Sequence, residues 1–100
     1  MENFDFGKAI ALLKQGEVVA RESWQGKKAI IKQVPAKISK EIIPKMQSLP
    51  DAAKQMILEN GNTNFIRYQA QTLEYYLETG RADSWHPTQD DIYAEDWIQL

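Results

Sequence analysis

The stretch with the most chemical potential runs from Trp85 to Trp97 and combines two tryptophans, the only histidine and four carboxylates. Indole rings beside amides and carboxylates suit the base and the ribose of a nucleotide. A second group lies far earlier, at Arg21 and Trp24. An arginine offers a planar fork to a diphosphate while an indole stacks on a base. These residue types together indicate a nucleotide-type ligand.

Seven residues are predicted to bind this ligand, and several have a structural alternative. Thr88 with Asp91 also matches a helix N-cap followed by its capping-box partner. Trp24 could instead cover a small sheet, and Arg21 could form a surface ion pair. The predicted ligand-binding residues are Arg21, Trp24, Trp85, Thr88, Gln89, Asp90 and Asp91.

An enzymatic reading starts from His86, which lies close to the carboxylates of the same stretch and could exchange protons with a phosphate ester. A lone histidine beside Trp and Pro is more typical of a packed or solvent-facing side chain. No glycine-rich phosphate loop, nucleophile elbow or paired-histidine motif accompanies it. We therefore predict no catalytic residue and no cofactor. One histidine and no cysteine also exclude histidine-rich and thiolate metal sites.

The elements that would position these residues predict an α+β fold: a small antiparallel β-sheet with an N-terminal helix, a short helical insertion and a short C-terminal helix. Residues 1–100 are predicted to form a single domain. Trp97 is expected in the core, and Tyr75 and Tyr76 should face opposite sides of a strand. The expected helical stretches span 3 or 5 to 15, 39–47 with an interruption at Pro44, and 51–59, and the expected strands 17–21, 28–34, 64–77 and 82–85.

The helical insertion is expected to bury five apolar residues, and residues 60–64 are read as a polar turn. Methionines at such positions usually fill gaps in a core. The expected core residues are Met46, Leu49, Met56, Ile57 and Leu58.

Charge is balanced overall but uneven along the chain. Twelve basic and fourteen acidic side chains give a net charge of -2, which gives no reason to expect a nucleic-acid polymer as partner. Residues 27–54 carry a local +5 and residues 81–100 a local -4. These regions either complement each other between subunits or are solvated faces. The chain has neither a signal-peptide pattern nor a long apolar run, so we predict a cytoplasmic protein without membrane contact.

Two blocks of the sequence resemble a known family. The pattern Trp85-x-Pro87-Thr88-Gln89-Asp90-Asp91-Ile92-x-Ala94-Glu95-Asp96-Trp97 resembles the C-terminal signature of small phage and prophage proteins that include the second type of Thoeris anti-defence protein. Residues 18–27, which hold the Arg-x-x-Trp-x-Gly pattern, are similar to the family's opening. Together the blocks cover about a third of the chain. The insert at 36–62 departs from the family pattern.

The resemblance implies a sponge, meaning a protein that holds an immune signal without degrading it. The signal would be glyco-cyclic ADP-ribose made by bacterial TIR enzymes, or a cyclic di- or trinucleotide of the CBASS defence system. The resemblance also implies a homotetramer with pockets built from neighbouring chains, acting in the cytoplasm of the infected host. The alternatives are a small nucleotide-phosphate hydrolase and an interaction module that blocks a defence protein, with its tryptophans as interface anchors.

Overall fold

The computed structural model describes residues 2–61 and 65–100 and confirms the predicted α+β class. The chain divides into two compact units. The sheet unit comprises Met1–Gln33 and Ala70–Leu100, and the insert unit comprises Val34–Gln69. Whether residues 1–100 behave as a single folding domain stays a prediction.

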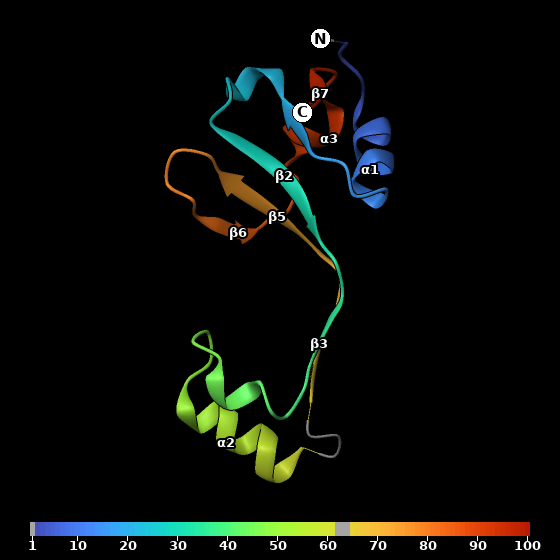
Figure 1. Ribbon diagram of the computed structural model, residues 1–100. Coiled ribbons are helices and arrows are strands. Elements are labelled where there is room, and N and C mark those ends of the chain that lie inside the picture. Colours follow the sequence, from blue (N-terminus) through green and yellow to red (C-terminus); the bar gives the residue numbers. More distant parts are fainter. Residues whose placement is uncertain (1, 62–64) are drawn as a thin grey trace. The chain divides into compact units, whose positions relative to one another are not determined.

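The sheet unit is built on five antiparallel strands in the order β6-β5-β2-β1-β7. Strands β2 and β5 lie side by side (Figure 1). Their pairing is the longest, from Lys28 opposite Tyr76 to Gln33 opposite Gln71. The C-terminal strand β7 pairs with β1, with Arg21 opposite Trp97, so the two blocks of the sequence pattern meet in one sheet. The strands are β1 (Val19–Arg21), β2 (Lys28–Gln33), β5 (Gln71–Tyr76), β6 (Ala82–Ser84) and β7 (Trp97–Gln99).

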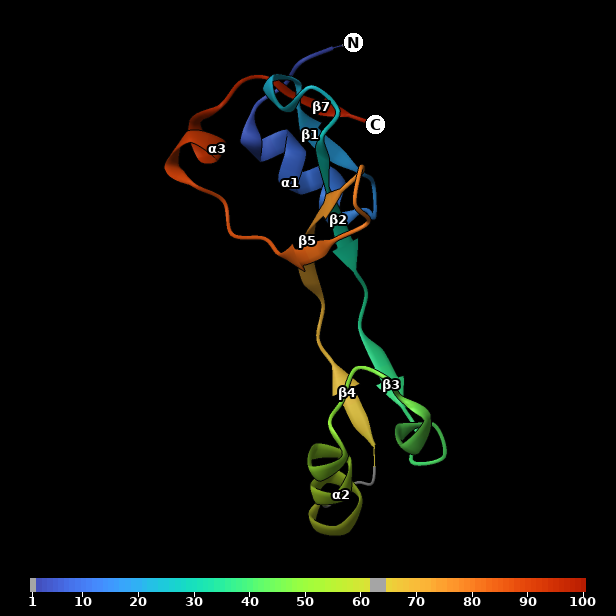
Figure 2. The ribbon, with the colours of Figure 1, turned by 90° about the vertical axis from the view of Figure 1, so that its left-hand side faces the viewer.

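Two helices complete the sheet unit, and both start where the sequence predicts. In α1 (Phe6–Lys14) the Asp5 side chain accepts a hydrogen bond from the Lys8 amide, and the chain leaves the helix through Gly16 at φ +90°. The short α3 (Gln89–Tyr93) follows its N-cap at Thr88. Figure 2 shows α1 beside β1 and β2, with which it is in contact.

An aromatic cluster forms the centre of the core. Trp97 is fully buried, as predicted, and its indole N–H donates to the Asp91 carbonyl at 2.9 Å. Its ring centroid lies 5.3 Å from that of Trp24, 6.0 Å from that of Trp85 and 5.9 Å from that of Phe6. Large rings in tilted and edge-to-face contact bury much apolar surface in a small chain.

The insert unit holds a two-stranded antiparallel sheet, a 3-10 turn and one α-helix, in which the two strands lie side by side (Figure 2). Helix 51–59 is confirmed as α2. The helical stretch predicted at 39–47, with its interruption at Pro44, is shorter than expected. Only one 3-10 turn forms around Pro44, whose ring removes a backbone donor and clashes with the preceding turn. The elements are β3 (Ala36–Ile38), the 3-10 helix Ile43–Lys45, α2 (Asp51–Asn60) and β4 (Ile66–Tyr68).

The long strand expected at 64–77 is divided between the two units. It forms β4 and β5, with a break at Gln69 and Ala70, where the sequence is weak for strand. The start of that prediction at Asn64, and Asn62 and Thr63 of the predicted polar turn, lie outside the described residues.

Burial in the insert unit is less than predicted. Among its described residues only Ile43 is fully buried. Met56 is 55% exposed, so its assignment to the core is wrong, because α2 has too little neighbouring structure to cover it. Met46, Leu49, Ile57 and Leu58 are half-buried. Within residues 2–61 and 65–100, no helix combines the length and apolar character needed to cross a membrane.

Candidate functional site

Arg21 ties the two blocks of the sequence pattern together. Its Nε donates to Asp96 Oδ1 at 2.8 Å, and a terminal guanidinium nitrogen donates to Asp91 Oδ1 at 3.1 Å. The other Asp91 oxygen accepts from the Thr88 amide at 2.9 Å, and Thr88 Oγ1 accepts from the Asp91 amide at 3.1 Å. The predicted capping box is thereby confirmed. Thr88, Asp91 and Arg21 form one continuous polar network.

The charges in this network stabilise each other. The hydrogen bond to Asp96 is the main cause that raises the pKa of Arg21, although burial acts in the opposite direction. Burial alone would raise the pKa of Asp96, but hydrogen bonds from Arg21 and Ser23 outweigh it and lower that pKa below its ordinary value. Both groups are therefore held in their charged forms.

Asp96 also fixes the turn that carries Trp24. Its second carboxylate oxygen accepts from the Ser23 amide at 3.0 Å, and its carbonyl accepts from the Glu22 amide at 2.8 Å. These bonds hold the 3-10 helix Glu22–Trp24. Gln25 and Gly26 then adopt left-handed φ values of 55° and 76° and lead the chain into β2. A left-handed glutamine is uncommon and often marks a functional turn.

The Trp24 pocket is an open hollow of about 320 Å³ on the sheet unit. Trp24 and Tyr76 supply two aromatic rings, and Lys27 and Lys28 supply two ammonium groups. The Lys28 ammonium lies 4.5 Å from the Trp24 ring centroid and 6.0 Å from the Tyr76 centroid. Stacking surfaces beside cations suit a base that carries phosphates. The pocket is lined by Ser23, Trp24, Gln25, Lys27, Lys28 and Tyr76.

Glu74 supports one side of the Trp24 pocket. Its carboxylate accepts a hydrogen bond from the Tyr76 hydroxyl at 2.7 Å and lies 3.7 Å from the Lys28 ammonium. The hydrogen bond to Glu74 is the main cause that raises the pKa of Tyr76. Sequence reasoning missed Lys28, Glu74 and Tyr76. Predicting them would have required the register in which β2 pairs with β5, because this register places Lys28 directly opposite Tyr76.

Of the seven predicted residues, only Trp24 lines this pocket. The structure brings Arg21, Asp91 and Thr88 together in the network behind the turn. Trp85 is 7% exposed and packs against Phe6 and Trp97. Gln89 and Asp90 are exposed in the first turn of α3, and His86 is exposed just before it. Ligand contacts at all seven residues, Trp24 included, stay predictions.

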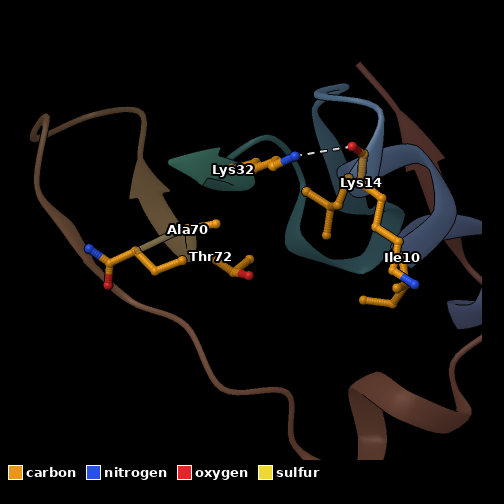
Figure 3. Close-up of a pocket in the computed structure, with 7 residues that line it drawn as sticks. Ile10, Lys14, Lys32, Ala70 and Thr72 are labelled. Carbon is orange, nitrogen blue, oxygen red and sulfur yellow. Dashed lines mark hydrogen bonds between the residues drawn. The ribbon is translucent and has the colours of Figure 1, made fainter. Parts of the chain in front are cut away.

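A second hollow, the Ile10 pocket, has about 220 Å³ and different chemistry (Figure 3). Ile10 and Leu13 of α1 and Ala70 give it aliphatic walls, and none of its lining residues is aromatic. The Lys32 ammonium donates to the Lys14 carbonyl at 3.1 Å, at the C-terminal end of α1 (Figure 3). Its lining residues are Ile10, Leu13, Lys14, Lys32, Ala70, Gln71 and Thr72.

The carboxylates do not assemble into a metal-binding cluster in the part of the chain that the structure describes, where no group of three or more His, Cys, Asp or Glu is suited to hold an ion. No curated protein gives a significant match to the chain. A family model matches residues 4–100, which include both blocks of the sequence pattern and the insert, and its description is "Thoeris anti-defense 2-like domain". The chain therefore belongs to the Tad2-like, or Thoeris anti-defense 2-like, family.

Proposed function

We propose that the protein binds and sequesters a nucleotide-type immune signal without cleaving it. Membership of a Thoeris anti-defence family is consistent with an anti-defence role. The observation that carries the proposal is the Trp24 pocket, in which two aromatic rings and two lysines converge. Aromatic rings stack on any nucleobase, and ammonium groups pair with the phosphates of the nucleotide.

The proposed signal is glyco-cyclic ADP-ribose made by TIR enzymes, with cyclic di- and trinucleotides of CBASS as further candidates. Each of these molecules combines at least one nucleobase with phosphate groups. Each therefore uses both functions of the Trp24 pocket. The proposed place of action is the cytoplasm of the infected bacterial host, where such signals are made.

The binding free energy that sequestration needs supports a binding site completed by a second chain. A protein that holds a scarce signal needs nanomolar affinity, or about -12 kcal/mol. Stacking contributes about 1–3 kcal/mol per base and a charge-assisted hydrogen bond about 1.5–3 kcal/mol, before the costs of association. One open pocket on one small chain falls short of that total. We therefore propose a homo-oligomer, a tetramer by family resemblance, with ligand pockets at subunit interfaces.

The predicted site residues take different roles in this proposal. Trp24 contacts the base directly. Arg21, Asp91 and Thr88 position the turn and α3, because their polar groups already bond to each other. The exposed Gln89 and Asp90 would contact a ligand held against a neighbouring chain.

Trp85 supports this site from the core. It packs edge-on against Trp97, and Trp97 in turn packs edge-on against Trp24. In this role Trp85 keeps the wall behind Trp24 rigid without touching the ligand.

The test is a capture-and-release experiment. The purified protein is incubated with TIR-derived cyclic ADP-ribose isomers and with cyclic di- and trinucleotides, filtered and heat-denatured, and the released molecules are identified by mass. We expect one or more intact nucleotides in the heat-released fraction. New products would indicate the hydrolase instead. Absence of any capture would contradict sequestration and favour an interaction module that blocks a protein.

A matched pair of variants tests the location of the site. Trp24→Ala should reduce capture roughly 5- to 150-fold, the loss of one stacked base. Tyr93→Ala is the control, because this ring is 78% exposed on α3 and lies outside the Trp24 pocket. Full nucleotide capture by Trp24→Ala would show that Trp24 is not part of the binding site.

A further inference from the structure

Lys28 lies where a base would stack. Trp24 also meets Trp97 of the core in an edge-to-face contact, with 5.3 Å between the ring centroids and 81° between the ring planes. In the pocket, the Lys28 ammonium lies over the Trp24 ring at 4.5 Å from its centroid. A stacked base needs its atoms roughly 3.5–4 Å from the ring atoms. The ammonium and the base therefore compete for one surface.

The position of Lys28 is fixed by three partners. The ammonium lies over Trp24, lies 6.0 Å from the Tyr76 centroid and pairs with Glu74 at 3.7 Å. Its side chain is only 25% exposed. Lys27 lines the same pocket, but none of the described residues places an aromatic ring beneath its ammonium. The two neighbouring lysines thus differ in whether they cover the stacking surface.

We infer that Lys28 is a specificity-determining residue that covers the Trp24 ring in the free protein and moves to a ligand phosphate when a base stacks there. A neutral nucleoside must displace the ammonium from the ring and offers it no anion in return. A nucleotide displaces it and supplies a phosphate beside the base. The pocket therefore selects anionic nucleotides over uncharged nucleosides, a refinement that rests on the proposed nucleotide-binding function.

The test uses adenosine and ADP-ribose as probes, because they share the adenine base and differ in the diphosphate. Binding is measured by quenching of tryptophan emission in wild type, Lys28→Met and Lys27→Met. For Lys28→Met we expect adenosine affinity to rise about two- to fivefold, because the cation–π contact no longer has to be broken. ADP-ribose affinity should fall about tenfold with the loss of one charge-assisted contact.

The control variants separate this mechanism from general electrostatics. Lys27→Met should weaken ADP-ribose binding without improving adenosine binding, because it removes charge and leaves the ring covered. Lys28→Arg retains a cation for the ring and should keep the preference of the wild type. It also keeps the test decisive if Lys28→Met unfolds, since a loss of preference in a folded Lys28→Arg protein would count against the inference.

Affinities for adenosine and ADP-ribose that change in the same direction in Lys28→Met, or do not change, would overturn the inference. Failure of the proposed function is seen separately, as a lack of capture of every cyclic nucleotide by the wild type. Even then, affinities for adenosine and ADP-ribose that change in opposite directions in Lys28→Met would establish that Lys28 covers the Trp24 ring.

Discussion

The Trp24 pocket and the Ile10 pocket, two hollows of the sheet unit, differ in chemistry more than in size. The Trp24 pocket has about 320 Å³, two aromatic rings and two lysines. The Ile10 pocket has about 220 Å³, aliphatic walls and also two lysines, of which Lys32 donates to the Lys14 carbonyl at the end of α1. Volume therefore does not distinguish them. The difference is that the Trp24 pocket offers an aromatic stacking surface beside its lysines, whereas none of the residues that line the Ile10 pocket is aromatic.

The two pockets also differ in what holds their walls in place. α1, β2 and the start of β5 shape the Ile10 pocket, so regular backbone hydrogen bonds fix it. Trp24 lies on an irregular turn that depends on Asp96 and, through Asp96, on Arg21. Substitutions in this network should disturb the Trp24 pocket and leave the Ile10 pocket intact.

The largest expected effect follows removal of Arg21. Its side chain is only 19% exposed, and Arg21→Gln leaves the carboxylates of Asp91 and Asp96 without their cation. The free energy of unfolding should fall by about 3 kcal/mol, measured by urea denaturation. Arg81→Gln is the control, because that guanidinium is 71% exposed in its ion pair with Asp83 and its loss should cost at most about 0.5 kcal/mol. Equal losses would contradict a supporting role for Arg21.

The next effect concerns the second ring of the Trp24 pocket. Tyr76→Ala should weaken nucleotide binding by about 1–2 kcal/mol, since a stacking surface is lost. Tyr76→Phe keeps the ring and should bind almost as wild type. Tyr75 points to the opposite face of β5, so Tyr75→Ala provides the matched control. The pocket assignment would be wrong if titration showed equal losses for the two alanine variants.

A smaller effect should appear at acidic pH. The pKa of Asp96 lies below its ordinary value of 3.8 in the folded state, so the folded protein binds fewer protons there than the unfolded chain. This stabilisation is present above about pH 4 and is lost as the pH falls through the folded-state pKa. Asp96→Asn should be less stable at neutral pH and lose less stability on acidification. Urea denaturation at several pH values checks this, and parallel stability curves for the two proteins would contradict it.

The smallest effect is expected in the Ile10 pocket. Lys32→Gln removes the hydrogen bond to the Lys14 carbonyl, and stability should fall by about 0.5–1 kcal/mol in thermal or urea denaturation. Nucleotide capture should remain at the level of the wild type. A strong loss of nucleotide capture in Lys32→Gln would indicate that the ligand binds in the Ile10 pocket, and would contradict the assignment of the ligand to the Trp24 pocket.

Local signals were readable from the sequence. The helix that begins near Asp5 and the Thr88–Asp91 capping box depend on residues close together in the sequence, and both form. Burial of Trp97 was also predictable from its place in an apolar terminal strand. The helical stretch predicted at 39–47 was expected to be interrupted at Pro44, and the proline reduces it further, to a single 3-10 turn.

Long-range pairing limited the prediction of the site. Trp24 and Trp85 look alike in the sequence, yet one lines a pocket and the other lies in the core. Lys28 and Tyr76 meet only because β2 pairs with β5 in one register. A shift of that register by one residue would turn their side chains to the other face. Spacing along the chain does not encode such a contact.

The most direct test of the central claim is to follow the three indole N–H resonances by NMR while adding the nucleotide that the wild-type protein releases on heating. Single Trp→Phe variants assign the signals. We expect the largest shift at Trp24, which lines the pocket, and smaller shifts at Trp85 and Trp97, which are buried in the core. A largest shift at Trp85, or binding that leaves the Trp24 signal unchanged, would contradict the claim that the Trp24 pocket holds the ligand.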